Sequence, residues 1–111
     1  SPSTSARSQA TLAAVLAHRG EVALARTYLR RVLSSGYRDH HVAYSVGAAY
    51  AQLGNFDEAE RWLRTAADTG FPCMVWFERD PLLEPLRRVP EFGGLMLYVR
   101  ERRDSSLPKT H

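Results

Sequence analysis

The apolar positions of this chain recur three and four residues apart, which is the pattern of amphipathic α-helices. Four such stretches lie between residues 6 and 70, and a glycine follows each of them. Helices commonly end at a glycine in the left-handed conformation, so the pattern predicts two helical hairpins. The positions expected to face the core are Leu12, Ala13, Val15 and Leu16; Val22, Ala25, Leu29, Val32 and Leu33; Ala43, Val46, Gly47, Ala49 and Tyr50; and Ala59, Trp62, Leu63 and Ala66.

The two hairpins follow one plan. Placing residues 6–39 on residues 40–73, an offset of 34 positions, gives seven identities without a gap. The identical pairs are Ala14/Ala48, Ala17/Ala51, Gly20/Gly54, Ala25/Ala59, Leu29/Leu63, Arg30/Arg64 and Gly36/Gly70. They fall where a helical hairpin needs a turn glycine or a small side chain between two close backbones. The sequence therefore predicts a repeated helix-turn-helix.

Polar residues mark where the helices of the second unit begin. Asp39 is a favourable N-cap for its first helix. Asn55 precedes its second helix, and Glu58 three residues later completes a capping-box pattern. We interpret Asp57 and Glu58 as residues that compensate the helix dipole, in preference to catalytic carboxylates.

The stretch AYSVGAAYAQLGNFDEAERWLRTAADTGFP, residues 43–72, resembles a tetratricopeptide repeat. The matching or nearly matching positions are Val46, Gly47, Tyr50, Ala59, Leu63, Ala66 and Pro72. Ala43 departs from the large residue that the family favours, and Pro72 falls one residue late. The first unit is more degenerate and keeps Leu12, Ala13, Leu16, Gly20, Ala25 and Leu29. The resemblance implies an all-α, right-handed solenoid of helical hairpins that binds other proteins.

The last third is not a third repeat of this kind. Pro72, Pro81 and Pro90 suit the starts of three short helices, with Asp80 as a cap before Pro81. Their apolar residues can cover the open end of the second repeat: Trp76, Phe77, Leu82, Leu83, Leu86, Phe92, Leu95 and Leu97. The segment also resembles C-terminal stretches of bacterial repeat proteins, which implies the end of a larger regulatory protein.

These observations predict five segments. We expect a disordered N-terminal segment over 1–5, repeats over 6–39 and 40–73, a helical cap over 74–103, and a disordered tail over 104–111.

Composition adds weak constraints. Basic residues outnumber acidic ones six to two in residues 6–39, but are outnumbered two to four in residues 40–73. A nucleic-acid partner needs a sustained basic stripe, so none is expected. No apolar run approaches a membrane span, and the single Cys73 cannot form an internal disulfide. We expect a cytoplasmic protein, and the use of Arg for almost every basic residue suggests a bacterial source.

Candidate chemistry is sparse. His40 and His41 project about 100° apart on a helix and do not readily share a metal ion. Cys73 stands among apolar residues and is expected to pack as a small hydrophobe, in preference to acting as a nucleophile. Phosphate-binding loops, nucleophile elbows and zinc-protease motifs are absent from the sequence. We therefore expect no catalytic residues, no metal and no cofactor.

Stacked hairpins create a concave face from the first helix of each unit. Helix phase places there Arg7, Thr11 and His18 from the first unit and His41, Tyr44, Ser45 and Gln52 from the second. This mixed surface, with Tyr44 as an aromatic anchor, suits a peptide or a partner helix. The family's carboxylate clamp is not expected, because Ala10, Ala14 and Ala48 occupy the positions where its side chains would lie.

Two functional hypotheses follow. The first is a non-catalytic protein-protein interaction module that binds a peptide or helix in this groove, as a scaffolding or sensory part of a larger protein. The alternative is self-association, or an intramolecular regulatory lid, through the exposed edge of the short array.

Overall fold

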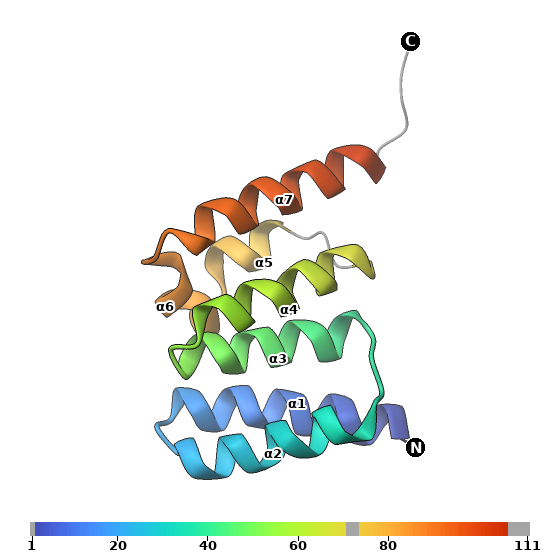
Figure 1. Cartoon of the computed structure of the whole chain (residues 1–111), viewed down its shortest axis with the longest axis vertical. Helices are drawn as coiled ribbons and strands as arrows, with labels where there is room; N and C mark the ends of the chain where they lie inside the picture. The colour runs from blue at the N-terminus through green and yellow to red at the C-terminus, as the bar shows by residue number, and fades with distance from the viewer. Residues whose placement is uncertain (1, 71–73, 107–111) are drawn as a thin grey trace.

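A computed structural model describes residues 2–70 and 74–106, which form helices joined by short turns. Figure 1 shows two antiparallel hairpins stacked on one another, with α7 packed on the second. The predicted all-α helical-hairpin solenoid is confirmed. The elements are α1 (Pro2–His18), α2 (Val22–Ser35), α3 (His40–Gln52), α4 (Phe56–Asp68), α5 (Met74–Arg79), the 3₁₀ helix η1 (Pro81–Leu83), α6 (Glu84–Arg87) and α7 (Glu91–Ser106).

The turns inside the two hairpins depend on glycine, as predicted. Gly20 between α1 and α2 has φ 85°, and Gly54 between α3 and α4 has φ 79°. Side chains are disfavoured in this left-handed region, so glycine lets the chain reverse there without strain. Equivalent glycines therefore place the two hairpins in equivalent geometry.

Small residues let the helices of each hairpin approach closely. Ala25 on α2 and Ala59 on α4 are completely buried. Gly47 on α3 lies so close to α4 that a Cβ atom there would be 2.7 Å from the Leu63 Cγ. The α1 helix packs against both α2 and α3, which joins the two hairpins into one core.

Of the two helix caps predicted for the second repeat, only one forms. The Asp39 side chain accepts a hydrogen bond from the Val42 backbone amide at 2.8 Å, as expected. Asn55 is the N-cap of α4 but makes no capping hydrogen bond through its side chain, so the predicted capping box is wrong. Its backbone ψ of 79° departs from the extended conformation of a standard N-cap.

The C-terminal segment covers the second hairpin. Phe77, Leu83, Leu86, Leu95 and Val99 are completely buried, so the expected apolar cap forms. Three short helices were expected in this segment, but the last helix, α7, has 16 residues.

Polar contacts hold α7 on α4. The Tyr98 hydroxyl donates to Asp68, and Arg102 forms an ion pair with the same carboxylate at 3.2 Å. The Arg64 guanidinium also lies 4.8 Å from the centre of the Tyr98 ring. The cap is therefore joined to α4 by both apolar and polar contacts.

Both ends are more helical than expected. Residues 2–5 belong to α1, because proline is tolerated in a first helical turn and Ala6 is buried on the next one. Residues 104–106 belong to α7, since no helix-breaking residue occurs before Pro108. The expectations for Pro72, Cys73 and 107–111 lie outside the described residues.

Some residues predicted for the core are exposed. Leu12, Val15 and Val22 lie on the first hairpin, where the described chain supplies no further repeat to cover them. Trp76 and Leu97 are 55% and 56% exposed. Trp76 projects about 100° around α5 from its neighbour Phe77, and it is Phe77 that packs into the core.

Candidate functional site

The inner faces of α1 and α3 carry a hollow that we name the Trp76 hollow. It encloses about 380 Å³. Trp76 projects from α5 at this hollow, although the sequence pattern had assigned it to the core. Four predicted groove residues line the hollow with two that were not predicted for it: Thr11, His41, Tyr44 and Ser45, with Trp76 and Asp80.

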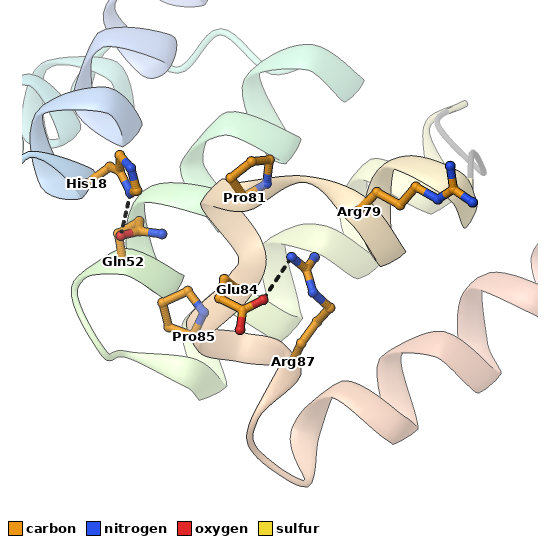
Figure 2. Close-up of a pocket in the computed structure, with 7 residues that line it drawn as sticks. All are labelled: His18, Gln52, Arg79, Pro81, Glu84, Pro85 and Arg87. Atoms are coloured by element: carbon orange, nitrogen blue, oxygen red, sulfur yellow. Dashed lines mark hydrogen bonds and ion pairs between the residues drawn. The ribbon is translucent and has the colours of Figure 1, made fainter.

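The remaining concave residues lie in a second hollow, which we name the Glu84 hollow. It encloses about 430 Å³ and is lined by His18, Gln52, Arg79, Pro81, Glu84, Pro85 and Arg87. Figure 2 shows His18 facing Gln52, with the His18 Nδ1 3.3 Å from the Gln52 Oε1. Arg87 reaches the Glu84 carboxylate at 3.1 Å. The charged groups here largely satisfy one another.

The capping segment separates the two hollows. The Tyr44 hydroxyl donates to the Asp80 carboxylate at 2.6 Å, and the Gln52 amide donates to the Leu82 carbonyl at 2.8 Å. The η1 helix also packs against both α1 and α3. The sequence predicted one continuous groove, but the C-terminal capping segment lies across this groove and divides it into two hollows. Tyr44 and Gln52 therefore hold the cap in addition to lining the hollows.

Asp80 connects the cap to the hollow in two ways. Its Oδ1 atom accepts from the Leu82 amide at 2.9 Å, which is the predicted cap of η1. Its Oδ2 atom accepts from Tyr44, whose ring packs edge-on against Phe77 with 5.6 Å between ring centres. A side chain bound from both sides is fixed in position. Asp80 therefore joins the lining of the Trp76 hollow to both α3 and η1.

Arg7, another predicted groove residue, is engaged in the turn before α3. Its guanidinium forms an ion pair with Asp39 at 2.7 Å. Partial burial alone would raise the pKa of Asp39, but hydrogen bonds from Val42, Arg7 and Tyr37 outweigh it and lower that pKa. Arg7 also lines a shallow hollow beside the first one, with Ser8, Thr11, Leu12 and Val15.

The described part of the chain offers little for other kinds of chemistry. No three His, Cys, Asp or Glu side chains within it are placed to hold a metal ion. The rings of His40 and His41 lie 4.1 Å apart between centres and are tilted by 40°. None of the described helices is long and apolar enough to cross a membrane.

Sequence reasoning favoured a core position for Trp76 over an exposed docking residue, and it gave no sign of the contact between Asp80 and Tyr44. Trp76 and Phe77 project about 100° apart on α5, and the docking of the C-terminal segment decides which of the two is buried. The contact between Asp80 and Tyr44 joins residues 36 positions apart, and no local signal in the sequence indicates it.

Comparison with known proteins agrees with the repeat architecture. Two models of the tetratricopeptide repeat match the chain, one at residues 5–40 and one at residues 41–65. No curated protein and no solved structure matches it. The two matched ranges meet next to the 39/40 boundary that the internal repeat predicts. Repeats of this kind generally mediate protein-protein interaction and are generally non-catalytic. The chain belongs to the tetratricopeptide repeat family.

Proposed function

We propose that this protein is a non-catalytic scaffolding module that binds an extended peptide segment of a partner protein in the Trp76 hollow. One observation carries this proposal: a tryptophan that is 55% exposed stands at a partly polar concavity on the inner face of the repeats. Large exposed aromatic side chains at concave sites are the usual anchors of protein recognition.

The lining residues supply complementary contacts. Trp76 offers apolar area at little entropic cost, because its side chain has only two rotatable bonds. The hydroxyls of Thr11 and Ser45 can each donate and accept hydrogen bonds with a peptide backbone. The Tyr44 hydroxyl already donates to Asp80, so we expect Tyr44 to contact a ligand through its aromatic ring.

The division of the groove favours an extended segment over a long helix. The cap crosses between the two hollows at Asp80 and Leu82, which blocks a straight path along α1 and α3. A volume of about 380 Å³ lies near the small end of ligand pockets and suits one or two side chains. A short extended peptide can insert one or two side chains into the hollow while the rest of its backbone remains outside.

A peptide-display selection tests this proposal. The wild-type protein is the bait, and each selected peptide is measured by calorimetry against Trp76→Ala and Leu97→Ala. Both positions are exposed apolar residues, and Leu97 lines none of the hollows described above. We expect Trp76→Ala to weaken binding at least about tenfold, as for an interface anchor, and Leu97→Ala to leave it unchanged. Peptides that bind both variants as tightly as the wild type would refute the proposal.

A second candidate is association through the N-terminal edge, which we define as Ser8, Leu12 and Val15 on α1. In the 34-residue repeat, these three positions correspond to Val42, Val46 and Ala49 of α3. All three α3 residues are completely buried, whereas Leu12 and Val15 are 38% and 37% exposed. The N-terminal edge therefore exposes apolar side chains at positions that are buried between repeats in the equivalent helix α3. A second copy of the chain could cover this edge.

Sedimentation over a range of protein concentrations tests this candidate with Leu12→Arg and Leu97→Arg. Both changes add one charge at an exposed apolar position. Self-association through the edge predicts a concentration-dependent mass that Leu12→Arg abolishes and Leu97→Arg preserves. A monomeric mass at all concentrations would contradict it.

A further inference from the structure

Asp80 is a buried carboxylate at the start of η1. Only 8% of the residue is exposed. Its two hydrogen bonds come from the Tyr44 hydroxyl and the Leu82 amide, which are both neutral groups. Among the residues that the structure describes, no ion pair reaches it. Buried carboxylates in proteins are normally paired with a cation or a metal ion, so this one is unusual.

The cationic residue next to Asp80 in the chain does not form an ion pair with it. Arg79 lines the Glu84 hollow and also a small apolar hollow that it shares with Trp76 and Asp80, but its guanidinium forms no ion pair with Asp80. In Figure 2 its side chain extends away from the other labelled residues. Among the described residues that line the Trp76 hollow there is no lysine or arginine, and His41 is the basic side chain there.

The carboxylate and the indole meet at the same hollow. Trp76 and Asp80 are four residues apart, and the Asp80 amide donates to the Trp76 carbonyl at 2.9 Å, so Asp80, directly after α5, lies one helical turn from Trp76. A flat aromatic face beside a carboxylate is the arrangement that receives a guanidinium or ammonium group, through cation–π attraction and charge pairing.

We propose that the Trp76 hollow selects a cationic side chain, arginine or lysine, from the partner peptide, which stacks on Trp76 and compensates Asp80. This inference rests on the proposed function and names the chemistry of its ligand. A neutral side chain in the same place would strip water from Asp80 without replacing its charge interactions. The hollow therefore discriminates by charge as well as by shape.

A titration with two capped tripeptides tests the inference. One has the sequence glycine-arginine-glycine, and the other carries citrulline, the neutral isostere of arginine, at its centre. Binding is followed at pH 8, where imidazole groups carry little charge, through the NMR signal of the Trp76 indole. The chain has two tryptophans, and Trp76→Phe identifies the signal.

We expect a saturable shift with the arginine peptide and binding of the citrulline peptide weaker by about tenfold or more, as for loss of a charged hydrogen bond. In Asp80→Asn, which keeps an acceptor for the Leu82 amide, the two peptides should bind equally. In Asp57→Asn, which removes one charge from an exposed position on α4, the preference should persist.

Equal binding of the two peptides to the wild type, or a preference that survives in Asp80→Asn, would overturn the inference. So would an indole signal that the arginine peptide leaves unmoved. These failures differ from failure of the proposed function. If the display-selected peptides still require Trp76, the peptide site stands and only the preference for a cation is wrong.

Discussion

The close contact between α3 and α4 at Gly47 yields a sharp stability prediction. A Cβ atom at this position would lie 2.7 Å from the Leu63 Cγ and 3.2 Å from the Ala59 carbonyl oxygen. Neither neighbour is the free end of a flexible chain, since one is a branch point and the other is backbone. Gly47→Ala must therefore push the two helices apart or force Leu63 out of its packed position.

The magnitude follows from two opposing effects. Overpacking a well-packed core costs about 1–3 kcal/mol, whereas replacing a helical glycine with alanine returns about 1 kcal/mol. Because both contacts are rigid, we take the upper part of the first range. Gly47→Ala should lower the free energy of unfolding by about 1–2 kcal/mol. The melting temperature should fall by roughly 4–10 °C.

Gly93→Ala is the matched control. Gly93 lies in α7 at an ordinary helical φ, and a Cβ atom there meets nothing within 4 Å. The same chemical change should stabilise the protein by about 0.5–1 kcal/mol. Urea denaturation followed by circular dichroism measures both variants. The packing argument would be refuted if the Gly47→Ala variant were as stable as the wild type. It would also be refuted if Gly47→Ala and Gly93→Ala changed the stability in the same direction.

The remaining predictions concern the helix caps, measured by the same denaturation assay. Asp39→Ala removes the hydrogen bond to Val42 and the ion pair with Arg7, and should lower the free energy of unfolding by about 1–2 kcal/mol. Asn55→Ala removes no capping hydrogen bond and should lower it by less than about 0.5 kcal/mol. Equal losses would contradict this difference. Because the pKa of Asp39 is lowered in the folded state, its stabilising contribution is present above the unfolded pKa near 4. It should be lost as pH falls through the folded pKa, and Asp39→Ala should lack this part of the acid dependence; a variant with the wild-type pH profile would disprove it.

The repeat architecture could be predicted because its determinants are local. Gly20 and Gly54 end helices in a conformation that other residues avoid, and Ala25 and Ala59 recur at the same point of each hairpin. Asp39 caps a helix through an amide only three residues away. Each of these signals acts within one or two helical turns, so the sequence pattern contains it.

The candidate site could be predicted only in part, because it depends on where the cap docks. Thr11 and Ser45 lie in the hollow as helix phase indicates. The bonds from Tyr44 to Asp80 and from Gln52 to Leu82 span 36 and 30 residues and divide the groove. Helical periodicity carries no information about such contacts. The exposure of Trp76 has the same origin, since Phe77 takes the core position beside it.

The central claim is that a partner peptide occupies the hollow formed by α1, α3 and α5. The most direct test is a selected peptide that carries a spin label, with the line broadening of amide and indole signals measured by NMR. The account predicts the strongest broadening at Ser45 on α3 and at the Trp76 indole. Strongest broadening instead around Trp62 on α4, in the separate hollow lined by Arg38 and Thr65, would contradict it.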